Sequence, residues 1–350
     1  MTRTQVLSID MMGGDHGPPE TVPGVAQAAE ALPAARFLLH GDEAKIGPEL
    51  ERHPGLKARA EIRHTDKSIA SDEKPAVALR RGKGSSMWNA IEAVRAGEAD
   101  AAISSGNTGG LMAISKLVLR MSIDFDRPCL VASWPGAKGL TTVLDVGANI
   151  DCDAERLVEF AIMGEAFHRA VHGVARPTVG LINVGSEDVK GHEEVREAHA
   201  ILSSGKFDLD YRGFVEGDDL SKNTVDVAVT DGFTGNIMLK TAEGTGRYVE
   251  QALKGALTSS PIAMLGAMLA RGGLLQFREK LNPPRAAPLL GLNGVVVKSH
   301  GGAKARDFRD AVLMASGFAQ SDFAAEIERN MKRLSAALAE SQASTVEEPS

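Results

Sequence analysis

The stretch 101-AAISSGNTGGLMAIS-115 joins an apolar run, a polar glycine-rich loop and an amphipathic segment, in that order. The apolar run at 101–103 predicts the end of a buried strand, and the loop at 104–110 follows it directly. The next apolar residues recur at helical spacing and predict a helix, namely Leu111, Ile114, Leu117 and Val118. A strand, a glycine loop and a helix in this order are typical of a parallel α/β sheet.

The loop at 104–110 has the composition of an anion-binding site. Backbone N–H groups in the first turn of a helix carry partial positive charge, and glycines let the backbone approach a ligand closely. The loop has neither the Lys-Ser/Thr ending of a nucleotide-binding P-loop nor the glycine spacing of a dinucleotide site. A loop that serves only the turn is the alternative interpretation. The candidate ligands for a phosphate or another oxyanion are Ser104, Gly106, Asn107 and Thr108.

The same order of apolar run, polar loop and helix recurs along the chain and predicts an α/β protein with a mostly parallel sheet. If the carboxyl ends of the strands share one edge of the sheet, the loops that follow them converge on one crevice. The strands are expected at 5–10, 37–40, 60–64, 127–132, 140–144, 179–184, 214–217, 225–230 and 291–298.

Polar residues in these loops are the remaining candidate site residues. Asp15 also suits a helix cap, and a lone histidine is more often structural than catalytic. The candidates after the successive strands are Asp10, Gly13, Gly14, Asp15 and His16; Asp145 and Asn149; Asn183, Glu187 and Lys190; Asp231, Gly232, Phe233 and Asn236; and His300.

Composition restricts the class of protein. The 350 residues are 43% hydrophobic but only 4% aromatic, which indicates an aliphatic core that suits helices packed on a parallel sheet. The formal net charge of −7 argues against broad nucleic-acid binding. Cys129 and Cys152 show neither metal-site spacing nor a disulfide framework. The sequence shows no signal peptide and no apolar run long enough to span a bilayer, so we expect a cytoplasmic location, with binding to a membrane surface left open.

A cationic cluster, Arg80, Arg81 and Lys83, precedes a predicted helix at 87–96. Such clusters are usually solvated surface. This one also suits an anionic substrate or an acidic protein partner, because it lies beside a Gly-Ser turn at the start of a helix.

Residues 252–282 differ in character from the rest of the chain. Ser260 and Pro261 mark a helix start, and we expect Gly272 and Gly273 to break the apolar segment into two arms of a protruding helical hairpin. A core helix or a dimer contact is one interpretation. A hairpin that presents apolar side chains and cations such as Arg278 to anionic lipid is the other. The apolar residues of the hairpin are Ile262, Leu265, Met268, Leu269, Leu274, Leu275 and Phe277.

We expect a single α/β domain over 1–340, with the hairpin inserted at about 252–282. An amphipathic helix at 323–338 is expected to close the fold, and the polar tail at 341–350 is expected to be disordered.

Six of these loops, taken in order, resemble the acyl-carrier-protein:phosphate acyltransferases of bacterial phospholipid synthesis, the PlsX family. The resemblance runs from about residue 5 to about residue 330, and the sequence departs from the family pattern mainly at 282–292, where PPRAAP replaces a segment richer in glycine and tyrosine. The matching segments are 10-DMMGGDH-16, 103-ISSGNTG-109, 144-LDVGAN-149, 181-LINVGSED-188 with Lys190 and Gly191, 230-TDGFTGN-236 and 297-VKSHG-301.

This resemblance implies a three-layer α/β/α fold similar to that of phosphotransacetylases and of the isocitrate and isopropylmalate dehydrogenases. It also implies a homodimer that associates loosely with the cytoplasmic membrane. The implied reaction moves a long-chain fatty acyl group from an acyl-carrier-protein thioester to inorganic phosphate. The acyl phosphate then feeds glycerol-3-phosphate acyltransferase in phosphatidic acid synthesis. Neither a cofactor nor a metal is expected.

The resemblance suggests a mechanism in which phosphate is its own nucleophile, so that no side chain is acylated. The loop at 104–108 would hold the phosphate, and N–H groups there or at Gly232 and Phe233 would stabilise the oxyanion. Lys190 and His300 would neutralise charge or protonate the departing thiolate, with Asp231 or Asp145 orienting one of them. The catalytic candidates are Lys190, His300, Asp231 and Asn236.

An aliphatic tunnel, roofed by the hairpin at 262–277, would hold the acyl chain. The acidic carrier protein would dock on cations, either those of the cluster at 80–83 or those near Arg278.

Three other functions stay open at the level of sequence. A phosphotransacetylase acting on a short acyl-CoA has the same fold and chemistry, but a two-carbon acyl group does not need the wide apolar hairpin. A metal- and NAD-dependent decarboxylating dehydrogenase would need a set of arginines for the substrate carboxylates, which we do not find. A non-enzymatic membrane scaffold that gathers lipid enzymes is the third.

Overall fold

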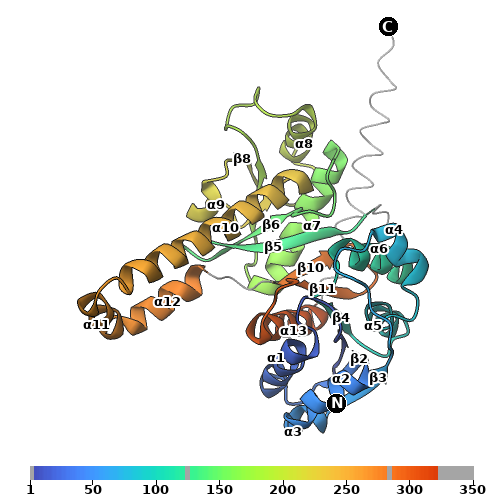
Figure 1. Ribbon diagram of the computed structural model, residues 1–350. Coiled ribbons are helices and arrows are strands. Elements are labelled where there is room, and N and C mark those ends of the chain that lie inside the picture. The colour runs from blue at the N-terminus through green and yellow to red at the C-terminus, as the bar shows by residue number, and fades with distance from the viewer. Residues whose placement is uncertain (1–3, 123–126, 282–285, 322–350) are drawn as a thin grey trace.

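The computed structural model describes residues 4–122, 127–281 and 286–321, with the side chains of 278–281 left out (Figure 1). Within these ranges, 11 strands form one continuous sheet, in the order β3-β2-β1-β4-β11-β10-β5-β6-β9-β7-β8. The strands are β1 (Val6–Asp10), β2 (Arg36–Gly41), β3 (Ala60–His64), β4 (Ala101–Ser104), β5 (Cys129–Pro135), β6 (Leu140–Leu144), β7 (Thr178–Ile182), β8 (Asp210–Val215), β9 (Val227–Val229), β10 (Ala286–Leu290) and β11 (Val295–Ser299).

Helices cover both faces of the sheet because the inner strands are apolar on both sides. In β4, Ala101 and Ile103 pack into the core on one face, and Ala102 packs into the core on the other. The first face is covered by α1 (Pro18–Ala31), α2 (Glu43–Glu51), α3 (Pro54–Lys57), α7 (Ala154–His172), α8 (Glu193–Ser203) and α13 (Ala305–Ala319). The second is covered by α4 (Pro75–Arg81), α5 (Ser86–Arg95), α6 (Thr108–Leu119), α9 (Asp219–Lys222) and the start of α10 (Gly232–Leu257). The predicted three-layer α/β/α fold is therefore confirmed.

The two halves of the sheet run in opposite directions. Strands β3, β2, β1, β4 and β11 are mutually parallel, and so are β6, β9, β7 and β8. Strand β10 is antiparallel to both β11 and β5, and β5 is antiparallel to β6. The carboxyl ends of the strands therefore do not all share one edge of the sheet, as convergence of their loops on one crevice would require, because two tight connections, at 136–139 and 291–294, reverse the chain.

Strand β10 was not expected from the sequence. Its first residues follow two prolines, and Pro288 lies inside it, so its pattern reads as a loop. The expected strand at 291–298 is instead the connection 291–294 followed by β11. The predicted helix at 323–338 and the polar tail at 341–350 lie outside the described residues.

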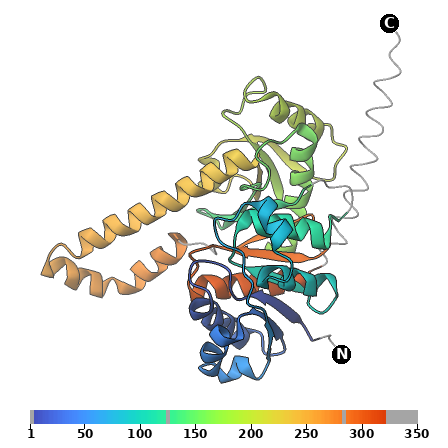
Figure 2. The same cartoon turned by 45° about the vertical axis from the view of Figure 1, so that its right-hand side comes forward.

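A helical hairpin projects from the body of the protein (Figures 1 and 2). Its outgoing arm is α10, which begins at Gly232. Its return arm consists of α11 (Pro261–Leu269) and α12 (Arg271–Leu281). The predicted cap is confirmed, since the Ser260 hydroxyl accepts from the N–H of Ala263 at 3.1 Å.

The expected break at Gly272 and Gly273 is wrong. Both glycines lie inside α12, and the chain turns at Ala270 instead.

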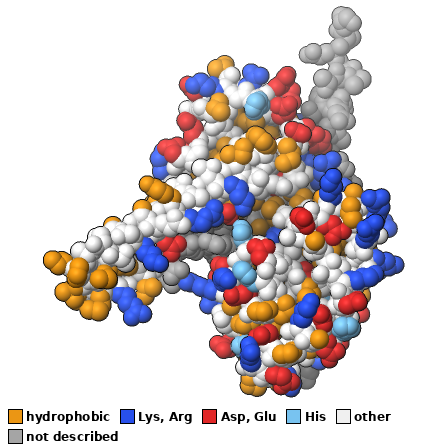
Figure 3. Space-filling view, in the orientation of Figure 1, with side chains coloured by type: hydrophobic (Ala, Val, Ile, Leu, Met, Phe, Trp, Pro, Cys, Tyr) orange, Lys and Arg blue, Asp and Glu red, His pale blue; other side chains and the backbone are white. Residues whose placement is uncertain are grey.

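The tip of the hairpin exposes large apolar side chains, as Figure 3 shows at the end of the projecting arm. Ile262 is 84% exposed and Leu269 is 80% exposed. Across the described residues, no single helix is long and apolar enough to cross a membrane. By length and composition, α10 and α11 pass that test only as a pair, and the two are bent by 117° relative to each other.

Candidate active site

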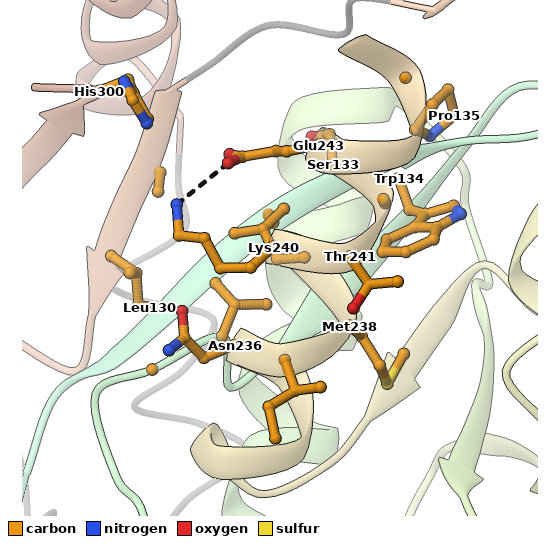
Figure 4. A pocket seen from close by; sticks show the side chains of 18 of the residues that line it. Leu130, Ser133, Trp134, Pro135, Asn236, Met238, Lys240, Thr241, Glu243 and His300 are labelled. Atoms are coloured by element: carbon orange, nitrogen blue, oxygen red, sulfur yellow. Dashed lines mark hydrogen bonds and ion pairs between the residues drawn. The ribbon is translucent and has the colours of Figure 1, made fainter. Parts of the chain in front are cut away.

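A cavity of about 850 Å³ lies between α10 and strands β5, β10 and β11 (Figure 4). In the figure, Lys240 and Asn236 lie on the flank of α10 nearer to His300, and Trp134 and Met238 lie on its other flank. Much of the wall is aliphatic or aromatic. The apolar lining includes Leu130, Ala132, Trp134, Val146, Ile237 and Ala287.

The polar end of the cavity is built by α6 and by the carboxyl end of β11. Thr108, the first residue of α6, lines it together with Lys298 and His300. The first N–H groups of an α-helix have no partner inside the helix, so α6 presents donors and partial positive charge here. Lys298 adds a full charge. This end of the cavity therefore has the character of an anion site.

Lys298 is a buried lysine in the cavity wall, and it is not among the site residues predicted from the sequence. Its side chain is 7% exposed, and its ammonium donates to the backbone carbonyls of Ser105 and Ser299. Burial lowers the pKa of Lys298 to about 8. The sequence signal was available, because strand alternation places Lys298 on the same face as the buried Val296.

His300 is held in one tautomer by its own loop. Its Nδ1 accepts a hydrogen bond from the N–H of Gly302 at 3.1 Å. A backbone N–H can only donate, so Nδ1 is unprotonated in this arrangement and the ring proton lies on Nε2. His300 is then a neutral hydrogen-bond donor.

Asp10 and Ser104 form a buried support behind the polar end. The hydroxyl of Ser104 donates to Asp10 at 2.6 Å and accepts from the N–H of Gly106 at 3.0 Å. Burial raises the pKa of Asp10 above its ordinary value of 3.8. Gly13 packs so closely that a Cβ atom there would lie 2.6 Å from the Gly106 nitrogen. Asp10, Gly13, Ser104 and Gly106 therefore fix the loops, and none of them lines the cavity.

The side chain of Asn107 is engaged within the protein. Its oxygen caps α6 by accepting from Gly110 at 2.7 Å, and its amide donates to the carbonyls of Ser71 and Glu73. Of the four phosphate ligands expected in the 104–108 loop, Thr108 alone lines the cavity among the described residues.

The loop after β1 closes against the loop after β11. The N–H of Asp15 donates to the carbonyl of Gly301 at 2.9 Å. Gly14 has a positive φ of 82° at this contact, which favours glycine. The side chains of Asp15 and His16 are exposed and do not line the cavity.

Asp145 holds the loop after β6. Its carboxylate accepts from the N–H groups of Leu130, Ala148 and Asn149, and from the side-chain amide of Asn149 at 2.9 Å. Burial nevertheless raises its pKa. These contacts are all within 130–149, and neither Asp145 nor Asn149 lines the cavity.

Residues at the start of α10 are also engaged in hydrogen bonds within the protein. Asp231 caps the helix by accepting from the N–H of Thr234 at 2.8 Å, and the N–H of Gly232 donates to Asn149 at 2.7 Å. Because that N–H is engaged, it does not offer an oxyanion hole. Phe233 is exposed. Of the four candidates at 231–236, Asn236 is the one that lines the cavity.

Lys190 lies apart from the cavity. It is exposed and forms an ion pair with the exposed Glu187 at 3.2 Å. Asn183 holds the base of this loop by donating to the Lys190 carbonyl at 3.1 Å. The structure thus brings His300 and Asn236 together at the cavity but leaves Asn183, Glu187 and Lys190 outside it.

The predicted cationic docking residues Arg80, Arg81 and Lys83 are exposed at the end of α4. The side chain of Arg278 lies outside the description. Across the described residues, no group of three or more His, Cys, Asp or Glu side chains is arranged to hold a metal ion.

Phosphotransacetylases are among the solved structures with a similar fold. One from Streptococcus pyogenes superposes with a TM-score of 0.62 at 16% identity and covers 91% of this chain and 95% of its own. The EutD phosphotransacetylase from Staphylococcus aureus gives a TM-score of 0.57 at 15% identity, covering 90% of this chain and 94% of its own. At this identity the likeness concerns the fold alone, and it confirms the predicted fold relationship.

Closer relatives are similar over nearly the whole chain. A family model described as "Fatty acid synthesis protein" matches residues 5–326. A phosphate acyltransferase of Phenylobacterium zucineum is 67% identical over 338 residues, which is 97% of each chain. One of Caulobacter vibrioides is 64% identical over 341 residues, covering 97% of this chain and 95% of the relative. Together with the fold and its cavity, these relatives define an enzyme of the acyltransferase class. The chain belongs to the phosphate acyltransferase family, the PlsX family, as the six sequence segments had indicated.

Proposed function

We propose that this enzyme transfers a long-chain acyl group from an acyl-carrier-protein thioester to inorganic phosphate and releases an acyl phosphate. One observation carries the proposal. A single cavity joins a cationic end, at Thr108, Lys298 and His300, to an apolar channel beneath α10. The names of the close relatives support phosphate as the acceptor.

The phosphate would bind at the cationic end. The first N–H groups of α6 and the Nε2–H of His300 are donors suited to a phosphate oxygen, and Lys298 balances its charge. The same donors would meet the oxyanion as the phosphate oxygen adds to the thioester carbonyl. Phosphate supplies the nucleophilic oxygen, so the main work of the protein is to hold the two reactants in contact.

The acyl chain would occupy the apolar part of the cavity. Leu130, Ala132 and Ala287 come from the sheet below, and Ile237 and Met238 come from α10 above. Trp134 and Pro135 lie at the opposite side of α10 from His300 in Figure 4. Among the described residues, the lining includes α10 up to Val249 but nothing from α11 or α12, so α10 would roof the chain instead of the tip of the hairpin.

The remaining parts of the proposal concern partners and placement. The acidic carrier protein would dock on the exposed cations at 80–83. The exposed apolar tip at 262–269 would rest on an anionic membrane surface, which makes the enzyme a cytoplasmic, peripherally bound protein. We also propose a single domain over 1–340, a homodimer, and delivery of the product to glycerol-3-phosphate acyltransferase.

The test follows carrier thiol released from palmitoyl–acyl carrier protein, with and without inorganic phosphate. Release that depends on phosphate, with an acyl phosphate trapped by hydroxylamine, is expected. The same assay with acetyl-CoA separates the rival enzyme. Turnover of acetyl-CoA alone would make the protein a phosphotransacetylase, and turnover of neither substrate would contradict the proposal.

A further inference from the structure

We propose that Lys298 is the general acid that protonates the departing thiolate, a role that rests on the proposed acyl transfer to phosphate. Lys298 lies two residues before His300, at the carboxyl end of β11, and both side chains line the same cavity as Thr108. A thioester carbonyl positioned against phosphate at this end would place its sulfur within the same polar group of residues.

The ammonium of Lys298 is fixed in direction by its surroundings. It donates to the carbonyl of Ser105, which follows β4, and to the carbonyl of Ser299 on its own strand. An ammonium has three N–H donors, so two carbonyl partners leave one donor over, on a residue that lines the cavity. A buried and oriented donor is what proton transfer to a leaving group requires.

The other candidate acids in and around the cavity are less suited. His300 holds its single ring proton on Nε2 and would have to become an anion to release it. Lys190 lies in an exposed loop outside the cavity wall. Lys240 faces the cavity but is exposed and paired with Glu243 at 3.0 Å. Asp10 is buried behind Ser104 and does not reach the cavity.

The charges around Lys298 set its acidity. Burial lowers its pKa to about 8, with Lys240 of α10 acting in the same direction, while the carboxylates of Asp10 and Asp15 oppose the shift. The pKa of an unperturbed thiol is about 8.5. An acid and a leaving group of similar pKa exchange a proton efficiently near neutral pH. At pH 7 Lys298 is mostly charged and ready to donate.

The step balances in atoms and charge. A phosphate oxygen forms a bond to the carbonyl carbon, and the carbonyl electron pair moves to oxygen. When that pair returns, the C–S bond breaks and its electrons leave with sulfur, which takes a proton from Lys298. The products are the acyl phosphate and the carrier thiol, and the proton released by the phosphate group restores the lysine.

The experiment compares leaving groups in a Lys298→Met variant. With palmitoyl–acyl carrier protein, whose leaving group is an alkyl thiol, we expect kcat to fall about 100-fold or more. With palmitoyl thionitrobenzoate, whose aryl thiolate leaves without a proton, the variant should retain activity within about 10-fold of the wild type. Equal losses on both substrates would overturn the proposal and leave Lys298 as a binding or structural residue.

Two further measurements keep the test decisive. Lys45→Met, a surface lysine on α2, serves as the matched control and should behave as wild type. In the unaltered enzyme, kcat on the carrier substrate should fall as the pH rises through about 8, where Lys298 loses its proton. A flat profile from pH 7 to 10 would contradict the role even if Lys298→Met did not fold. Hydroxylamine-trapped palmitoyl phosphate from the wild type shows separately whether the proposed function itself holds.

Discussion

The hydroxyl of Ser104 donates to the buried carboxylate of Asp10 across 2.6 Å and ties the carboxyl end of β4 to that of β1. These two strands carry the loops that support the polar end of the cavity. The pair is fully enclosed, and the enclosure raises the pKa of Asp10 above 3.8. The cavity wall thus rests on a carboxyl group that the fold holds in an unfavourable environment when it is charged.

This placement predicts how stability depends on pH. The pKa of Asp10 is higher in the folded protein than in the unfolded chain, so this group contributes to the free energy of unfolding while it is protonated. That contribution is lost as the pH rises from 3.8 through the folded pKa. Asp10→Asn removes this titration. The free energy of unfolding, measured by urea denaturation, should therefore fall more steeply with pH in the wild type than in the variant over that window. Parallel curves would show that burial does not perturb Asp10.

We expect small residues in the cavity wall to determine which acyl chain lengths the enzyme accepts. Ala132 is buried on β5 in the apolar wall, so Ala132→Leu would fill part of the channel. We expect turnover of palmitoyl–acyl carrier protein to fall at least about 10-fold relative to the octanoyl substrate. Ala137→Leu, in the exposed turn between β5 and β6, is the matched control. An unchanged ratio in Ala132→Leu would place the acyl chain elsewhere.

Asp231 caps α10, and two variants can separate this role from that of a catalytic carboxylate. Asp231→Ala removes the acceptor for Thr234 and should destabilise the protein by about 0.5–2 kcal/mol. Asp231→Ser retains a capping oxygen without a negative charge, so both stability and kcat should return close to wild type. Stability would be followed by thermal denaturation and kcat by thiol release. A serine variant that is stable but inactive would assign the carboxylate to the reaction.

We expect charged substitutions at the hairpin tip to abolish binding to a membrane surface without altering the cavity. Ile262→Glu with Leu269→Glu places charge on two side chains that are at least 80% exposed. The double variant should no longer float with phosphatidylglycerol vesicles, because insertion would bury both carboxylates in lipid. Tyr248→Glu, an exposed aromatic residue on the shaft of α10, is the control and should still float. Loss of flotation in the control alone would move the contact away from the tip.

Much of the fold was predictable from the chain because strand, loop and helix alternate clearly, as in 101–115. The reversal of strand direction within the sheet was not predictable from the chain. It depends on the connections 136–139 and 291–294 and on β10, which contains Pro288 and therefore does not have the sequence pattern of a strand. At the site, residue type was a guide to location more than to role. Asn107 and Asp145 were correctly placed in loops, but their side chains hydrogen-bond within the protein. Lys298 was not predicted as a site residue because it lies inside an apolar strand.

The long helix α10 has one further consequence. Its 26 residues span about 39 Å, and among them Gly232 and Gly235 in the first turn are the buried positions. The helix is therefore anchored at a pivot near its start, while its next turns roof the cavity and its far end leads to the apolar tip. A helix fixed at one end in this way can tilt as a rigid body about that end. A tilt imposed on the tip would change the height of the roof over the proposed acyl channel, so attachment of the tip would be mechanically linked to access to the channel.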